Sequence, residues 1–113
     1  MAEHDELTID AQVSGDTVTV YCGGRVTLAS APRLRHEVKS LLPQARVVTL
    51  DLTTVTLLDS FGLGTIAALY ASARAAGCEL RLVNISPRIR ELFSVTRLLS
   101  LFEPCGETNV RMM

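Results

Sequence analysis

The residues that could take part in chemistry gather at residues 57–64, LLDSFGLG, where a predicted strand gives way to a predicted helix. Ser60 offers a hydroxyl group directly after the carboxylate of Asp59, and both residue types are favoured at the N-cap of a helix. Gly62 and Gly64 follow at the start of the helix, where each glycine costs roughly 1 kcal/mol relative to alanine. Because glycine leaves the backbone bare, we predict that another protein approaches the Ser60 hydroxyl closely. The alternative is that the segment only caps the helix and packs it against the sheet.

Catalytic arrangements find little support in the sequence. The two histidines are His4, in an acidic N-terminal stretch, and His36, on a charged predicted helix. No GxSxG turn is present to expose a nucleophilic serine to such a base. Gly62 and Gly64 form a GxG fragment that completes neither the GxGxxG nor the Walker pattern of nucleotide-binding loops. We therefore expect that the protein is not an enzyme and needs no cofactor.

The three cysteines, Cys22, Cys78 and Cys105, are odd in number and widely spaced. They form no CxxC pair and lie near no cluster of histidines. The sequence thus indicates neither a zinc site nor the disulfide framework of a secreted protein. We interpret the cysteines as structural thiols of a protein in a reducing cytoplasm. A regulatory bridge between Cys78 and Cys105 is the alternative.

Length and composition are typical of one globular domain. The chain has 113 residues, of which 48% are hydrophobic and 20% charged, and its net charge is −1. Such a charge gives no general attraction to nucleic acid backbones. No stretch reaches the roughly 20 apolar residues of a transmembrane helix, and residues 1–10 are acidic where a signal peptide is basic and then apolar. These features predict a cytoplasmic domain that neither inserts into a membrane nor binds nucleic acid directly.

The elements that must position Ser60 begin with a hairpin. Apolar and polar residues alternate over residues 7–13 and again over residues 18–22, and the turn-forming residues 14–16 (SGD) separate the two runs. Two alternating runs joined by a glycine-containing turn predict an antiparallel hairpin. The glycine pair at residues 23–24 is expected to end its second strand.

After the hairpin, helical and strand patterns alternate. Apolar residues at helical spacing predict a helix after the N-cap Ser30 and a second helix from Ser60 that ends at Gly77. Ser86 followed by Pro87 predicts the start of a third helix. Strands are expected at residues 47–52, 79–84 and 99–102.

This order of elements predicts an α/β fold with a mixed sheet. The N-terminal hairpin is antiparallel, the later strands are parallel, and about three to four helices cover the sheet. We expect one domain over residues 7–105, an acidic N-terminal tail over residues 1–6 and a short C-terminal tail over residues 106–113.

The D-S-x-G-L-G pattern at residues 59–64 resembles the signature of STAS domains, particularly those of bacterial anti-sigma-factor antagonists. Residues 24–26 (GRV) and 30–32 (SAP) look like the family's turn from the hairpin into its first helix. The resemblance continues at residues 86–93, the start of the third helix. It covers residues 7 to 103 in the family's order and implies a single STAS-like domain.

What this resemblance implies is a partner switch. In such antagonists, the serine directly after the motif aspartate is phosphorylated by a cognate anti-sigma factor that is also a serine kinase, and that residue is Ser60 here. The unmodified form binds the anti-sigma factor and so releases a sigma factor for transcription, and a phosphoserine phosphatase resets the system. The expected partner-binding residues are Arg25, Thr27, Asp59, Ser60, Phe61, Gly62, Leu63 and Gly64.

Two positions depart from the family pattern. Phe61 stands where many antagonists have serine or threonine, and its ring either anchors a partner or turns inward as part of the core. Thr27 stands where the family often has an aspartate, so one acidic group of the expected interface is missing. Two other interpretations stay open. One is a scaffold or sensor of a signalling assembly, which binds its partner whatever the state of Ser60, and the other is an accessory subunit of a membrane transporter.

Overall fold

The structure is a computed structural model that describes residues 7–106 and 108–112, so the predicted acidic tail at residues 1–6 lies outside the described residues. In chain order, the strands and helices are β1 (Thr8–Ser14), β2 (Thr17–Val26), α1 (Ala31–Leu41), the 3-10 helix η2 (Leu42–Gln44), β3 (Val47–Leu58), α2 (Ser60–Ala76), β4 (Glu79–Val83), α3 (Pro87–Val95), the 3-10 helix η3 (Leu98–Leu101), β5 (Phe102–Pro104) and β6 (Val110–Met112).

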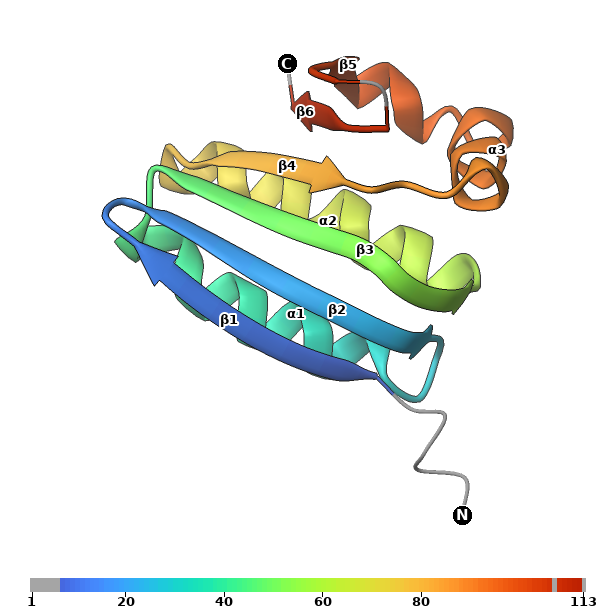
Figure 1. Cartoon of the computed structure of the whole chain (residues 1–113), viewed down its shortest axis with the longest axis horizontal. Coiled ribbons are helices and arrows are strands. Elements are labelled where there is room, and N and C mark those ends of the chain that lie inside the picture. Colours follow the sequence, from blue (N-terminus) through green and yellow to red (C-terminus); the bar gives the residue numbers. More distant parts are fainter. Residues whose placement is uncertain (1–6, 107, 113) are drawn as a thin grey trace.

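The described strands form one mixed sheet in the order β1-β2-β3-β4-β6-β5. The hairpin of β1 and β2 is antiparallel, β2, β3 and β4 are mutually parallel, and β6 runs antiparallel to both β4 and β5. Helices α1 and α2 lie side by side on one face of the sheet, and α3 lies beyond the end of β4 (Figure 1). The expected α/β fold with a single STAS-like domain is therefore confirmed, with three α-helices among the described residues.

The core lies between the sheet and helices α1 and α2. Alternate side chains of the three parallel strands point toward these helices and are completely buried, and so are the inner side chains of the helices. The most deeply buried are Val20, Val48, Leu50, Leu80, Leu82, Val38, Leu69 and Phe93. Burying apolar area of this kind is the main favourable term in folding. None of the helices in the described part of the chain is long and apolar enough to cross a membrane.

The second strand of the hairpin is longer than the sequence predicts. The glycine pair at residues 23–24 does not end β2, which continues to Val26 and pairs with β3 up to Leu58. The register shifts on either side of the glycines, and Gly24 has a φ of 85°. Irregular steps of this kind bend a strand without ending it. The bend carries β2 along the second half of β3, so both strands end beside the start of α2.

The C-terminal part of the fold differs most from the predicted elements. Residues 98–101 form η3 rather than a strand, and strand β5 begins only at Phe102. Residues 110–112, expected in a tail, form β6 between β4 and β5. The physical reason is that Val110 is buried opposite Leu82, which an exposed tail residue would not be.

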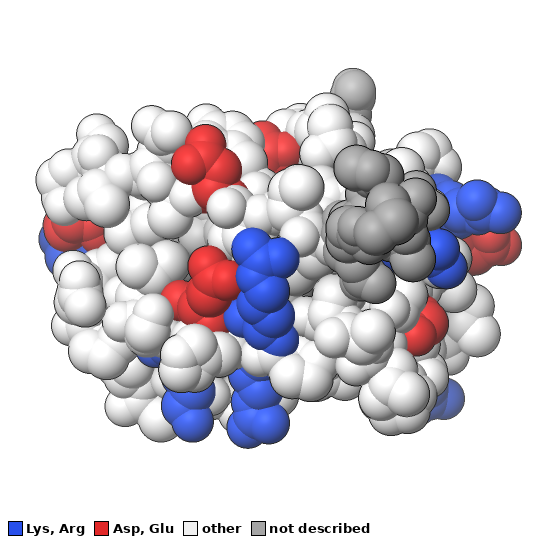
Figure 2. Space-filling view, turned by 90° about the horizontal axis from the view of Figure 1, so that it is seen from below, with Lys and Arg blue, Asp and Glu red and all other residues white. Residues whose placement is uncertain are grey.

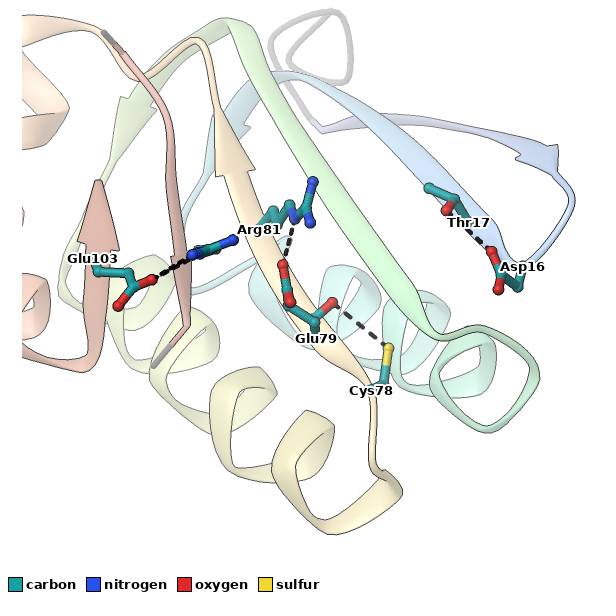
Figure 3. A network of polar contacts seen from close by, with 7 residues as sticks. Asp16, Thr17, Cys78, Glu79, Arg81 and Glu103 are labelled. Atoms are coloured by element: carbon teal, nitrogen blue, oxygen red, sulfur yellow. Dashed lines mark hydrogen bonds and ion pairs between the residues drawn. The ribbon is translucent and has the colours of Figure 1, made fainter. Parts of the chain in front are cut away.

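Charged side chains lie on the other face of the sheet at these last strands. The Arg111 Nη2 atom lies 2.8 Å from Glu103 Oε2, which joins β6 to β5. On the neighbouring β4, Arg81 pairs with Glu79 (Figure 3). Both pairs are partly exposed, so each adds little stability on its own. Arg111 of β6 lies opposite Arg81 on one side and Glu103 on the other, so this short strand has charged neighbours on both sides.

Candidate functional site

Asp59 is the N-cap of α2 and fixes the start of that helix. Its backbone is extended, and its Oδ1 atom accepts hydrogen bonds of 2.9 Å from the backbone N–H groups of both Phe61 and Gly62. The Asp59 carbonyl oxygen accepts a further bond of 2.9 Å from the N–H of Leu63. The first turn of a helix otherwise leaves its N–H groups unpaired, so this carboxylate satisfies two of them and complements the positive end of the helix dipole.

The same carboxylate joins the helix to a distant loop. Asp59 Oδ2 accepts a hydrogen bond of 3.1 Å from the N–H of Leu28, and the Asp59 N–H donates to the carbonyl of Val26 at 3.2 Å. The loop between β2 and α1 is in turn closed by Ser30, whose hydroxyl donates to the Arg25 carbonyl at 2.7 Å and accepts from the Thr27 N–H at 3.0 Å. The predicted N-cap Ser30 thus stabilises this loop, and its side chain does not cap α1.

Ser60 is the first residue of α2 and is exposed. Among the described residues, none forms a hydrogen bond with the Ser60 hydroxyl. The residue that the sequence singles out is therefore presented to the surroundings on a rigidly capped helix start.

The two glycines of the motif have different surroundings. A Cβ atom added to Gly62 would lie 2.5 Å from Leu58 Cδ1 and 2.6 Å from the carbonyl oxygen of Val26, whereas one added to Gly64 would meet nothing within 4 Å. Gly62 is buried and lets the helix start touch the end of β2, so it does not provide the bare backbone that we predicted for an approaching protein. Gly64 is exposed and fits that prediction.

Phe61 points outward, which answers the question that the sequence left open. The residue is 52% exposed and lines a groove of about 420 Å³ between α1 and the start of α2. Leu63, by contrast, is half-buried and packs against the core. The groove is lined by Leu28, Ala31, Pro32, Arg35, His36, Lys39, Phe61 and Thr65.

Further exposed side chains border the Ser60 position. Leu28 is 61% exposed and lines the groove together with Phe61, and these two side chains form what we call the apolar patch. Leu57 is 41% exposed and lies two positions before Asp59. Arg25 is exposed and pairs in register with Leu57, and Thr27 is half-buried in the adjoining loop. The structure therefore brings Arg25 and Thr27 to the same end of the sheet as residues 59–64. Sequence analysis did not select Leu28, and it included Leu57 only as the first residue of the segment 57–64.

The cysteines stay apart from this site. All three are free thiols in the structure, with Cys22 and Cys78 buried and Cys105 exposed, so there is no bridge between Cys78 and Cys105 here. Burial, together with the nearby Asp51 charge, raises the pKa of Cys22 to about 12, which keeps this thiol protonated and unreactive at neutral pH. In the described part of the chain, no three His, Cys, Asp or Glu residues lie close enough to hold a metal ion.

Comparison with known proteins places this geometry in a family. The STAS domain family model matches residues 8–111. The chain belongs to the STAS domain family. It is similar to the anti-sigma-B factor antagonist of Bacillus subtilis, with 28% identity over 97 residues that cover 86% of this chain and 89% of the relative. The protein of the same description from Listeria monocytogenes is 29% identical over 89 residues, which are 78% of each chain.

Solved structures share the fold of this STAS domain. An anti-sigma factor antagonist from Mycobacterium paratuberculosis superposes with a TM-score of 0.75 at 23% identity, covering 85% of this chain and 82% of that one. The phosphorylated form of the Bacillus protein SpoIIAA gives 0.66 at 18% identity, covering 81% and 84%. A sulfate transporter family protein from Wolinella succinogenes gives 0.70 at 18% identity, covering 79% and 73%. Because this fold occurs in both kinds of protein, the residues around Ser60 must carry the functional argument.

Proposed function

We propose that this STAS domain is an anti-sigma-factor antagonist that switches partners through phosphorylation of Ser60. Its unmodified form binds an anti-sigma factor that is also a serine kinase, which frees a sigma factor for transcription in the cytoplasm. The kinase then phosphorylates Ser60 and ends the complex, and a phosphoserine phosphatase restores it. In this scheme the protein is a ligand and a substrate, not an enzyme.

The observation that carries the proposal is the exposed, unbonded hydroxyl of Ser60 next to the apolar patch. A kinase needs a hydroxyl that it can reach, and the capped start of α2 presents one on a rigid element. A partner needs apolar area to bury. Phe61, the residue after Ser60, and Leu28, whose N–H binds the Asp59 carboxylate, offer it. Aromatic side chains in such positions are common anchors of interfaces. Arg25, Thr27 and Gly64 complete the surface that the partner contacts.

The charge of a phosphate explains how the complex ends. A phosphoserine carries about −1.5 to −2 charges at pH 7. At Ser60 this charge lies beside the Asp59 carboxylate, which already accepts the N–H groups of Phe61 and Gly62. These two donors are therefore not available to neutralise the phosphate. The protein keeps its fold, because a helix N-terminus favours negative charge, and the added charge acts on the partner surface, where it faces a site shaped for a neutral hydroxyl.

The test compares three tagged proteins, the wild type, Ser60→Ala and Ser60→Asp, as baits in a lysate of the native host. We expect wild type and Ser60→Ala to retain a kinase-like anti-sigma factor and Ser60→Asp to lose it, with an affinity at least about a hundredfold lower once the partner is purified. Incubating that partner with ATP and the wild-type protein should add one phosphate, which mass spectrometry locates at Ser60.

Ser94→Asp is the matched control. Ser94 is also an exposed helical serine, but it lies on α3 and does not line the groove beside Phe61. This variant should bind the partner as wild type does. That result would show that binding is weakened by a charge at Ser60 and not by an added charge in general. If all three baits retain the same partner equally, Ser60 only starts a helix and the protein is a scaffold of a signalling assembly. Recovery with membrane transport components would favour the transporter subunit instead.

A further inference from the structure

The outer edge of β1 lacks the features that usually keep sheet edges from pairing. Strand β1 is at one end of the sheet and pairs with β2 in an unbroken register from Thr8 to Ser14. It contains no proline, no lysine and no bulge, and its one charged residue is Asp10. Natural proteins protect edges with these devices because an unpaired row of N–H and C=O groups accepts another strand.

The opposite edge of the sheet is protected by a short strand, a proline and a charged pair. Strand β5 has three residues, one of which is Pro104, and the ion pair between Glu103 and Arg111 lies across it. A strand so short offers few unpaired backbone groups, and a proline withholds one donor. The contrast marks β1 as the edge that is open to pairing.

The helix-facing side of β1 is also incompletely covered. Val13 is 70% exposed and Ala11 is exposed, whereas Ile9 is half-buried. A groove of about 160 Å³ remains between β1 and α1, with Val38 and Leu41 of the helix on its far side. Figure 2 shows the molecule from below, with basic and acidic side chains among uncharged ones. The apolar side chains on the helix-facing side of β1 are therefore only partly covered by the rest of the molecule.

We propose that this edge binds a second copy of the same chain, strand β1 against strand β1 in antiparallel order, to give one sheet that continues through both molecules. The strand TIDAQVS is complementary to itself when its centre, Ala11, lies on the two-fold axis. Each residue then faces the residue equally far on the other side of Ala11. Ile9 meets Val13 on the helix side, and Asp10 meets Gln12 on the other face.

This register satisfies both faces of the new pair. Apolar side chains directly opposite each other stabilise an antiparallel pair, and like charges opposite each other destabilise it. Here the two copies of Asp10 are not opposite each other, since each faces Gln12. The second copy also extends the apolar row over the groove beside α1. A partner with a different edge sequence would have to reproduce this pattern, which the chain itself already supplies.

The pairing leaves the Ser60 sites free. The first residue of β1, Thr8, pairs with Gly23 near the end of β2, which is the end of the sheet that carries Ser60. Antiparallel strands place this end of one copy beside the opposite end of the other. The two Ser60 sites therefore lie at opposite ends of the joint sheet, and association does not depend on the state of Ser60.

The first test is the mass of the purified full chain in solution. Sedimentation equilibrium over roughly 1 to 500 μM, the range expected for a small interface, should show a monomer in equilibrium with a dimer. Val13→Lys should weaken the dimer by about tenfold or more, because it places a charge opposite Ile9 twice in each dimer. Val95→Lys is the matched control, since Val95 is an equally exposed valine on α3. It should leave the dimer unchanged, as should Ser60→Asp.

Cross-linking tests the register, in a Cys105→Ser background that removes the exposed thiol. Opposed side chains in an antiparallel pair have Cβ atoms about 4.5–5.5 Å apart, so Ala11→Cys should cross-link to itself with a short bismaleimide. Ile9→Cys and Val13→Cys should each fail alone, since the two copies of either residue are four positions, or about 14 Å, apart along the strand. A mixture of these two variants should cross-link.

Several results would overturn the proposal. A monomer at every concentration means that the edge does not bind a second copy. A dimer that survives Val13→Lys unchanged is formed by another surface. Efficient cross-linking of Val13→Cys to itself, with no product that joins Ile9→Cys to Val13→Cys in the mixture, excludes this register. Circular dichroism of each variant establishes that loss of the dimer is not loss of the fold.

Discussion

Helices α2 and α3 start at the same kind of place, the carboxyl end of a parallel strand of one sheet, yet the two starts are built differently. At α3, the Ser86 hydroxyl accepts one hydrogen bond of 3.2 Å, from the N–H of Ile89, and Pro87 occupies the first turn. At α2, the Asp59 carboxylate accepts two bonds from its own helix and a third from Leu28, a residue 31 positions earlier. Both starts are capped, so capping by itself does not distinguish a functional site.

The difference between them lies in what surrounds each cap. Ser60 follows Asp59 with an exposed hydroxyl and exposed apolar neighbours, whereas Pro87 and Arg88 follow Ser86. Asp59 also fixes the loop that carries Leu28, so the helix start and part of the apolar patch are held by one side chain. The two starts thus differ in the contacts that each cap makes outside its own helix. Four substitutions test how far this comparison holds.

The largest effect is expected from Gly62→Ala. The new methyl group would lie 2.6 Å from the Val26 carbonyl, a backbone atom that cannot easily move, so we expect a loss of up to about 3 kcal/mol in the free energy of unfolding. Urea denaturation measures it. Gly64→Ala is the control, since its methyl group meets nothing, and it should stabilise the protein by roughly 0.5–1 kcal/mol. Equal effects of the two substitutions would contradict the different roles assigned to these glycines.

Asp59→Ala should cost about 2 kcal/mol, because it leaves three backbone N–H groups without their charged acceptor. Asp59→Asn is the conservative comparison. Its amide oxygen can still accept from Phe61 and Gly62, but the amide nitrogen cannot accept from Leu28. It should therefore retain part of the stability, and hydrogen exchange should show faster opening at the Leu28 amide specifically. Uniform exchange rates across the loop in both variants would mean that the Leu28 bond is unimportant.

Ser86→Ala should cost about 1 kcal/mol, the usual value for losing one N-cap hydrogen bond. The informative quantity is the difference between the losses in free energy of unfolding caused by Ser86→Ala and by Asp59→Ala. Both variants are measured under identical denaturation conditions. Because the Ser86 side chain caps only its own helix, we expect no change in partner binding. A cost equal to that of Asp59→Ala would show that the two additional hydrogen bonds of Asp59 add nothing.

The smallest effect on stability is expected from Ser60→Asp. The helix dipole favours a negative charge in the first turn, while the neighbouring Asp59 carboxylate opposes it, so the free energy of unfolding should change by less than about 0.5 kcal/mol. Thermal unfolding of this variant and of wild type gives the value. A large destabilisation would make unfolding, rather than a changed interface, the mechanism of the proposed switch.

The parts of the fold that local chemistry determines were predictable from the sequence. Ser86-Pro87 starts α3 as expected, and α2 ends at Gly77, whose φ of 71° is the left-handed conformation that glycine adopts readily. The hairpin turn at Gly15, with a φ of 63°, is of the same kind. In each case the residue type itself specifies the backbone conformation, so no information from distant residues is needed.

The parts that distant contacts determine were not predictable in this way. Strands β5 and β6 have three residues each, too few for a period to show, and β6 exists because β4 is there to pair with it. Gly62 and Gly64 look alike in the sequence, and only the position of Val26 makes one of them internal. The motif located the candidate site in the sequence, but the inward and outward directions of its residues required the structure.

The place of β6 between β4 and β5 also affects the order in which the chain can fold during synthesis. When β4 and β5 have left the ribosome, β5 still lacks its one neighbour in the sheet, and one edge of β4 is unpaired. Both edges are satisfied only after Val110–Met112 has emerged. A nascent chain halted before that point exposes the inner edge of a parallel sheet, the kind of surface that chaperones cover and that other unfinished chains can join.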